Sequence, residues 1–159
     1  MSSPCAIFSA TARDVEELSI LVGELLDEIV SATGVDPFGF DLAETSGRLQ
    51  DFIDRGKYFV FLARAEQGRM AGFISIYESH ALYAQGAFGT IAELYVRPEY
   101  RSRGVGLALM AEARALATTR DWRRLEVTTP PLPEFDRTLA FYEREGFSIT
   151  GGRKLKVAL

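Results

Sequence analysis

The sequence predicts a mixed α/β fold in which helices lie on both faces of a partly parallel sheet. Apolar residues recur with helical spacing in some stretches and alternate or run together in short β-rich ones, giving the element order βααβββαβαββ. That order calls for a sheet covered by helices. A helix joins the strand at residues 90–96 to the strand at residues 124–128, so these two strands are expected to be parallel.

Length and composition indicate one globular domain spanning residues 1–159. The chain has 159 residues, of which 47% are hydrophobic and 25% charged, a balance typical of a folded domain. Eighteen basic against 22 acidic side chains leave a net charge of −4. No general positive field therefore draws nucleic acid or an anionic membrane, and any anion site must be local.

The small number of cysteine and histidine residues excludes several kinds of metal and disulfide site. Cys5 is the single cysteine and His80 the single histidine, which rules out an intrachain disulfide, a multi-cysteine metal cluster and a two-histidine zinc site. No leader pattern is visible, and no apolar run approaches the ~18 residues of a membrane span. We expect a cytoplasmic protein without a metal, a nucleic-acid partner or a membrane partner.

The amino-terminal part is expected to form one strand followed by two helices. Residues 5–9 form a strand-like run, and Thr11 with Asp14 looks like a capping pair that opens the first helix. Gly34 ends this helix. A second helix is expected over residues 42–55, where the apolar residues gather on one side.

The middle of the chain changes to the period of strands. Residues 58–64 and 70–77 are typical of a β-hairpin around a turn at residues 67–68. Residues 80–89, which carry tyrosine and glycine, are expected to form a loop. Another strand follows at residues 90–96 and ends near a proline.

The remaining elements alternate between helix and strand. We expect a helix over residues 104–119, a strand over 124–128 and a last helix over 137–145. Residues 147–149 and 154–157 flank a pair of glycines and are predicted to form a closing hairpin.

The segment Arg101-Ser102-Arg103-Gly104-Val105-Gly106 lies between a strand and a helix. Free N–H groups and the dipole at a helix start suit a phosphate-like anion, and glycines allow a ligand to approach the main chain. The alternative is that the glycines only permit a tight turn and close packing. Leu107 and Leu109 stand where a Walker loop and a dinucleotide fingerprint need other residues, so both of those motifs are excluded.

Three motifs together resemble the GNAT superfamily of N-acetyltransferases. They are Arg-x-x-Gly-x-Gly at residues 101–106, the preceding Glu-Leu-Tyr-Val-Arg-Pro at 93–98, and Ala-Phe-Tyr-Glu-Arg-Glu-Gly-Phe at 140–147. The element order extends the resemblance over nearly the whole chain. It implies a GNAT-like fold that binds acetyl-CoA in a cleft where two parallel strands separate.

The resemblance also implies roles for individual residues. The main chain of residues 101–106 would hold the pyrophosphate, and the backbones of Tyr95 and Val96 would pair with the pantetheine amides. Phe141 would also contact the cofactor. Tyr142 matches the proton donor to the leaving thiolate, and Glu93 matches a general base that acts directly or through water. One departure is that Phe135 stands where many relatives carry asparagine, although the next residue, Asp136, is placed to cap the last helix.

The chemistry of acetyl transfer suits these residue types. A primary amine with a pKa near ~10.4 must lose a proton before it attacks, and a thiol with a pKa near ~8.5 leaves more easily when it is protonated. Neither step needs a metal. Two simpler interpretations stay open: Tyr142 as a packed aromatic residue and Glu93 as a solvent-facing strand residue.

The acceptor is the least determined part of the prediction. The resemblance places residues 31–40 and 83–88 around it, with Phe38, Tyr83 and Glu93 as candidate contacts. We expect a small-molecule amine or polyamine, or a protein amine, and a homodimer is left open. The alternative to an N-acetyltransferase is a non-catalytic acyl-CoA-binding sensor, and transfer to a hydroxyl oxygen is a third hypothesis.

Overall fold

A computed structural model describes residues 5–159. The chain divides into two compact units, Met1–Thr128 and Thr129–Leu159. The first unit contains the sheet and the helices α1, α2 and α3, and the second contains α4. The single domain expected from the length stays a prediction.

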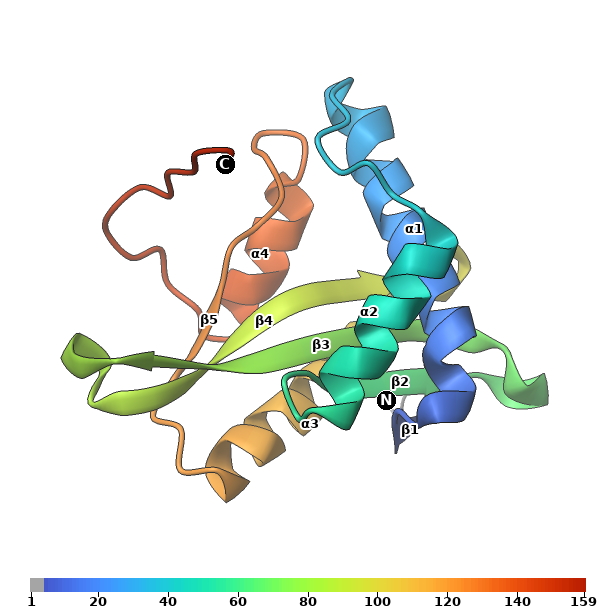
Figure 1. Ribbon diagram of the computed structural model, residues 1–159, viewed down its shortest axis with the longest axis horizontal. Coiled ribbons are helices and arrows are strands. Elements are labelled where there is room, and N and C mark those ends of the chain that lie inside the picture. Colours follow the sequence, from blue (N-terminus) through green and yellow to red (C-terminus); the bar gives the residue numbers. More distant parts are fainter. Residues whose placement is uncertain (1–4) are drawn as a thin grey trace. The chain divides into compact units, whose positions relative to one another are not determined.

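The first unit is built on a five-stranded sheet (Figure 1). Each strand neighbours the next in chain order, and only the last pair, β4 with β5, is parallel. The mixed sheet and its parallel pair confirm the sequence prediction. The strands are β1 Ala6–Ser9, β2 Phe59–Arg64, β3 Met70–Ala81, β4 Gly86–Val96 and β5 Leu125–Val127.

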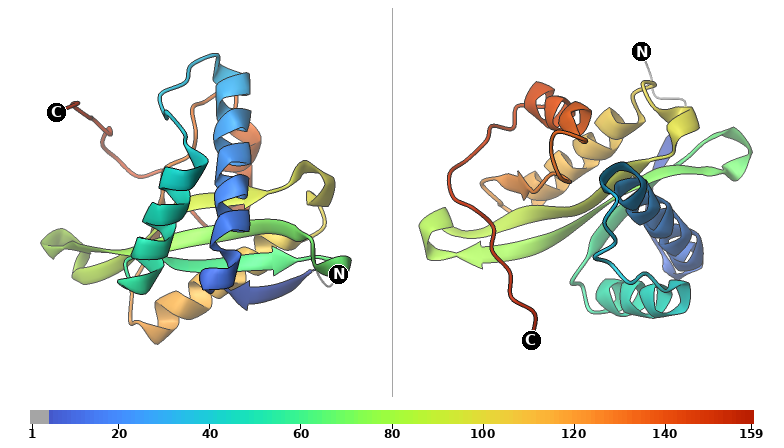
Figure 2. Two further views of the ribbon diagram at one scale, coloured as in Figure 1. Left: turned by 45° about the vertical axis from the view of Figure 1, so that its right-hand side comes forward. Right: turned by 90° about the horizontal axis from the view of Figure 1, so that it is seen from above.

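Helices cover both faces of this sheet, as predicted. The long helix α1 (Val15–Thr33) lies on one face beside α2 (Leu42–Asp54), and α3 (Val105–Thr119) lies on the other (Figure 2). Leu18 and Leu21 of α1 join Phe73 and Tyr95 of the sheet in one buried cluster. Burial of such side chains is the main force that holds the layers together.

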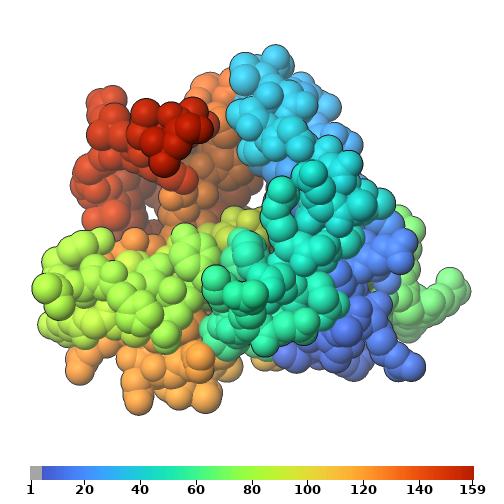
Figure 3. All heavy atoms as spheres, in the orientation of Figure 1, coloured from blue at the N-terminus to red at the C-terminus, as the bar shows by residue number. Residues whose placement is uncertain are grey.

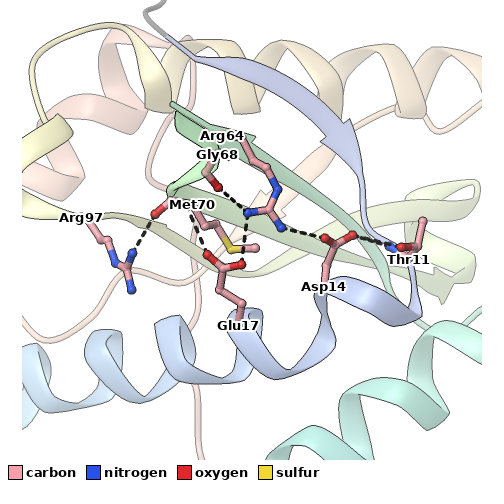
Figure 4. A network of polar contacts seen from close by, with 7 residues as sticks. All are labelled: Thr11, Asp14, Glu17, Arg64, Gly68, Met70 and Arg97. Atoms are coloured by element: carbon pink, nitrogen blue, oxygen red, sulfur yellow. Dashed lines mark hydrogen bonds and ion pairs between the residues drawn. The ribbon is translucent and has the colours of Figure 1, made fainter. Parts of the chain in front are cut away.

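A polar network ties the start of α1 to the β2–β3 hairpin (Figure 4). Arg64 contacts Asp14 at 2.8 Å and Glu17 at 3.1 Å. Glu17 also accepts a hydrogen bond from the Met70 amide at 3.3 Å. Asp14 accepts from the Thr11 amide at 2.9 Å, so the capping pair expected from the sequence is present. The network fixes the helix against one end of the sheet.

The loop predicted over residues 80–89 is too long, since the turn covers residues 82–85. β3 continues to Ala81 and β4 begins at Gly86, so the two strands form a long arm that is visible in Figures 1 and 3. The Ser79 and Thr90 hydroxyls lie 2.7 Å apart across this arm, and Phe88 is buried. Cross-strand pairing therefore outweighs the local turn preference of the glycine residues.

The second unit contains the predicted last helix, α4 (Asp136–Arg144). Asp136 is the first helical residue, Phe135 occupies the N-cap position, and neither makes a side-chain cap bond; the predicted cap is therefore wrong. The closing hairpin is also wrong, since residues 147–159, all of them described, contain no strand. Leu155 and Val157 are 91% and 81% exposed. A two-stranded hairpin of this length is marginal without a sheet edge or an apolar face to pack on.

Candidate active site

The parallel strands β4 and β5 pair over three positions and then part. Ile91 pairs with Val127, where β5 ends, whereas β4 continues to Val96. Within the described residues, positions 92–96 have no strand beside them on the β5 side. The register therefore provides the separating parallel strands that the resemblance implies.

A glycine allows the pairing at the start of β5. A Cβ atom at Gly89 would lie 2.6 Å from the Trp122 ring and 2.7 Å from Leu125 Cδ2. Trp122 is itself fixed by a 2.7 Å hydrogen bond from its indole N–H to Glu78 Oε1. The absence of a side chain at Gly89 thus allows β5 to join the sheet here, and the two strands pair as far as Ile91 before they separate.

The open edge of β4 presents the main-chain groups of alternate residues. The Arg97 amide donates to the Ala71 carbonyl at 2.8 Å, and Val96 lies opposite Gly72. In an antiparallel ladder the hydrogen-bonding direction alternates along the strand. It follows that the N–H and C=O groups of Val96 point away from β3.

The same alternation separates Tyr95 from Leu94. Tyr95 pairs with Phe73, so its main-chain groups belong to the β3 ladder, whereas those of Leu94 point to the open edge with those of Val96. The backbone contact predicted for Val96 fits this geometry. The backbone contact predicted for Tyr95 does not fit it, because the main-chain groups of Tyr95 face β3.

Residues 101–106 form the turn between β4 and α3. Ser102 and Gly104 have positive φ angles of 62° and 81°, and Gly104 is the N-cap of α3. The first turn of the helix, which begins at Val105 and includes Gly106, carries N–H groups without an intrahelical acceptor. Val105 is 1% exposed and anchors the turn in the core. The turn therefore offers the main-chain donors that were predicted for a phosphate.

The two arginines of this turn differ in their surroundings. Arg101 donates from Nε to the Val96 carbonyl at 2.8 Å, and its Nη2 lies 2.8 Å from Glu28 Oε1 on α1. Arg103 is exposed. Arg101 thus joins the turn, the end of β4 and helix α1, whereas the Arg103 side chain extends into solvent.

Glu93 lies half-buried beside two hydroxyl groups. Ser75 Oγ donates to Glu93 Oε1 at 2.6 Å, and Tyr58 Oη lies 3.5 Å from Oε2. Burial raises the pKa of the Glu93 carboxyl above its ordinary value, while the two hydroxyl donors oppose that rise. Glu93 is therefore a desolvated carboxylate with the properties of a general base, and it does not simply face solvent.

A hollow of about 530 Å³ is lined in part by Tyr58, whose hydroxyl contacts Glu93. Its aromatic lining consists of Phe52, Tyr58 and Tyr77, with Tyr58 stacked parallel to Tyr77 at 6.1 Å between ring centroids. Tyr58 belongs both to this lining and to the surroundings of Glu93. Figure 3 shows the end of α2 meeting the β3–β4 arm in this region. The remaining lining residues are Gly56, Lys57, Glu78 and His80.

The structure does not bring the predicted acceptor contacts Phe38 and Tyr83 together. Phe38 is 40% exposed in the connection between α1 and α2. Tyr83 is 80% exposed in the turn between β3 and β4, with the Arg124 guanidinium 5.4 Å from its ring centroid. The two segments lie apart in every view of Figures 1 and 2. Tyr58, which lines the hollow, is instead the aromatic residue that contacts Glu93.

Tyr142 and Phe141 belong to the second unit. Tyr142 is 4% exposed and makes edge-on contacts with Phe141 and Phe147, with centroid distances of 5.5 and 5.4 Å. Burial raises the pKa of Tyr142 above the ordinary tyrosine value, so the phenol keeps its proton at neutral pH. That state suits a proton donor, and the catalytic role of Tyr142 and the cofactor contact of Phe141 stay predictions.

Sequence reasoning missed Ser75, Tyr58 and Leu94. Ser75 had a signal, because it is the one polar residue in the otherwise apolar stretch at residues 70–76. Leu94 follows from strand alternation once the register of β3 and β4 is known. Tyr58 had no such signal, since it lies 35 residues from Glu93 in the sequence.

The described residues, 5–159, contain no group of three or more His, Cys, Asp or Glu side chains that could hold a metal ion. Within the same residues, none of the helices is both long enough and apolar enough to cross a membrane.

Comparison with known proteins agrees with this geometry. An uncharacterized N-acetyltransferase of Mycobacterium bovis is 26% identical over 113 residues, covering 71% of this chain and 67% of the relative. A predicted acetyltransferase of Clostridium acetobutylicum, solved with acetyl-CoA, superposes with a TM-score of 0.77 at 16% identity, covering 97% of this chain and 96% of the other. The ribosomal-protein-alanine N-acetyltransferase of Brucella melitensis gives 0.70 at 20% identity, covering 96% and 99%.

The family comparison covers more than half of the chain. Residues 55–149 match the acetyltransferase (GNAT) domain. That range includes the separating strands, the turn at residues 101–106 and the carboxylate of Glu93. The protein is therefore a member of the GNAT acetyltransferase family.

Proposed function

We propose that this protein transfers an acetyl group from acetyl-CoA to an amine, with Glu93 as the general base. The observation that carries the proposal is the position of Glu93. Its desolvated carboxylate lies on β4, two positions past the last residue that pairs with β5. A base at this point can reach an acceptor that enters between the separating strands.

The chain offers main-chain groups that fit acetyl-CoA. The open edge at Leu94 and Val96 suits the amide groups of the pantetheine arm, and the donors at residues 101–106 suit the pyrophosphate. When bound, acetyl-CoA supplies an acetyl thioester, whose carbonyl carbon is the electrophile. Family members use this donor, which supports the same assignment for this chain.

Glu93 and Tyr142 carry the proton transfers of the proposal. An alkylamine acceptor is mostly protonated at neutral pH, since such amines have a pKa of ~10.4 in water, so a carboxylate must take a proton before the nitrogen attacks. Glu93 accepts that proton directly or through water. Tyr142, as a neutral phenol, donates a proton to the thiolate that leaves.

The ring-lined hollow supports an amine with an apolar or flat part. Aromatic faces such as those of Tyr58 and Tyr77 attract alkylammonium groups and cover hydrocarbon. The acceptor classes are small amines, polyamines and protein amines, and in this proposal the non-reacting part of the acceptor lies beside Tyr58.

The test is release of free CoA thiol from acetyl-CoA in the presence of a panel of aryl-alkyl amines, polyamines and amino-terminal peptides. We expect release that depends on the amine, together with an N-acetylated product by mass spectrometry. The Glu93→Gln variant serves as the control, since it should bind acetyl-CoA and turn over slowly. Tight binding of acetyl-CoA without amine-dependent release would contradict the proposal and favour a sensor.

A further inference from the structure

Ser75 is a buried polar residue in the middle of the sheet. It lies on β3 between Ile74 and Ile76 in the sequence, and the residue is only 1% exposed. A hydroxyl in such a place costs free energy unless its hydrogen bonds are made. The partners of Ser75 therefore show what the hydroxyl does.

Both hydrogen bonds of the Ser75 hydroxyl are made with Glu93. Its Oγ donates to Glu93 Oε1 at 2.6 Å and accepts from the Glu93 amide at 3.0 Å. The first distance lies in the range of a strong hydrogen bond between a hydroxyl and a carboxylate. The main chain and the side chain of Glu93 are thus held by the same oxygen atom, which restricts the rotamer of the carboxylate.

An irregularity in the strand pairing makes this arrangement possible. Ser75 pairs with Glu93, but the next residue, Ile76, pairs with Ile91, so Ala92 is an extra residue in β4. Such bulges disrupt the ladder locally and re-aim a side chain. At this bulge the Glu93 amide takes the Ser75 hydroxyl as its acceptor.

We propose that Ser75 is a positioning residue for the base, holding Glu93 Oε1 so that Oε2, beside the Tyr58 hydroxyl, receives the proton of the acceptor. The inference rests on the proposed function, because it gives Glu93 its role. Ser75 itself touches no substrate in this proposal and acts through the carboxylate.

The hydroxyl also affects the pH at which the base works. Glu93 is faced by Ser75 from β3 and by the titratable Tyr58 from the segment before β2, and no ion pair to it occurs in the described part of the chain. A hydrogen bond donated to the ionised form lowers the pKa of a carboxyl. Loss of the Ser75 hydroxyl should therefore raise the pKa of Glu93, and turnover should begin to fall at a higher pH as the solution is acidified.

The test compares Ser75→Ala with Ser79→Ala. Ser79 lies on the same face of β3 and also pairs its hydroxyl with a β4 side chain, that of Thr90, at 2.7 Å. Two quantities are measured in each variant: the pH dependence of kcat/KM, and the titration of the Glu93 carboxyl by ¹³C NMR in the enzyme without substrate. The NMR signal is assigned by its loss in Glu93→Gln.

In Ser75→Ala we expect two midpoints to rise by about one pH unit, which is a tenfold change in the ionisation constant. They are the pH at which kcat/KM is half-maximal on the acidic side and the pH at which the NMR signal of Glu93 is half-titrated. Both should stay unchanged in Ser79→Ala. Unchanged midpoints in Ser75→Ala, or an equal rise in Ser79→Ala, would overturn the inference. Full activity of Glu93→Gln would overturn the proposed base itself, and with it the role of Ser75. The NMR midpoint does not depend on activity, so it separates the two failures.

Discussion

Glu24 of α1 forms a bidentate ion pair with Arg97, which follows the end of β4. Both carboxylate oxygens of Glu24 accept hydrogen bonds from the Arg97 guanidinium. Arg97 Nη2 lies 2.8 Å from Glu24 Oε2, and Nε lies 3.0 Å from Oε1. Arg97 is 9% exposed and also donates from Nη1 to the Met70 carbonyl at 3.0 Å. This contact holds helix α1 against the strand end from which the turn at residues 101–106 departs.

We predict that Glu24→Gln destabilises the protein by about 1–3 kcal/mol near neutral pH, because a buried guanidinium loses its charged partner. Hydrogen bonding to Arg97 lowers the pKa of Glu24 below its ordinary value. A group whose pKa is depressed in the folded state contributes stability above the unfolded pKa and loses it as the pH falls. The difference in free energy of unfolding between wild type and variant should therefore be largest above pH 4.5, the ordinary pKa of a glutamate carboxyl. It should shrink as the pH falls below that value.

The measurement is urea unfolding at several pH values, with Glu99→Gln as the control. Glu99 pairs with Arg69 at 2.7 Å, but both side chains are at least half exposed, so its loss should change the free energy of unfolding little. Equal effects of the two substitutions would contradict the structural role of Glu24.

A second prediction concerns the turn that leads into α3. Acetyl-CoA should stabilise the folded protein by ~2.7 kcal/mol at a hundredfold excess over its Kd. Gly104→Ala should reduce this stabilisation strongly, because a Cβ would crowd the main-chain donors proposed for the pyrophosphate. The readout is the rise in Tm caused by acetyl-CoA.

Gly34 provides a matched control for that substitution. It has a φ of 74°, close to the 81° of Gly104, and a Cβ at either position meets nothing within 4 Å. Alanine at a positive φ costs about 1–2 kcal/mol in both variants. Only Gly104→Ala should lose the response to acetyl-CoA, and an equal loss in both would point to backbone strain instead of a ligand contact.

Tyr142→Phe tests the proposed proton donor. The substitution removes the hydroxyl and keeps the edge-on contacts with Phe141 and Phe147, so the Tm should change little. Turnover should fall by ~10²–10⁴-fold if proton donation limits the rate. The loss should shrink with an acyl donor whose thiol is more acidic. Turnover equal to wild type, measured where chemistry is rate-limiting, would leave Tyr142 a packing residue.

Gly89→Ala tests the point at which β4 and β5 come together. The added methyl group would meet the Trp122 ring and Leu125, so we expect a loss of about 1–3 kcal/mol from overpacking. Binding of acetyl-CoA should weaken as well, because the separation of the strands begins beside this contact. Gly47→Ala, in open space within α2, should instead gain about 0.5–1 kcal/mol. The comparison requires urea unfolding and calorimetric titration of both variants.

The sequence alone determined the features that depend on residues near one another in the chain. The spacing of apolar residues located α1, α2, α3 and α4, and the pair Thr11 and Asp14 marked the start of the first helix. The glycine-bearing turn at residues 101–106 and the carboxylate at Glu93 were visible as motifs. Helix periodicity, capping and turn chemistry act over a few residues, which is why they can be recognised without a structure.

Tertiary structure decided everything that depends on pairing between distant segments. The bulge that brings Ser75 to Glu93 joins residues 18 apart, and the contact with Tyr58 spans 35. No local pattern specifies a strand register, because register follows from which face each strand buries against the helices. The same reason explains the two errors in strand prediction. Residues 80–81 and 86–89 became strand because β3 and β4 pair there. Residues 147–159 stayed irregular because a strand pattern without a partner has nothing to satisfy its main-chain groups.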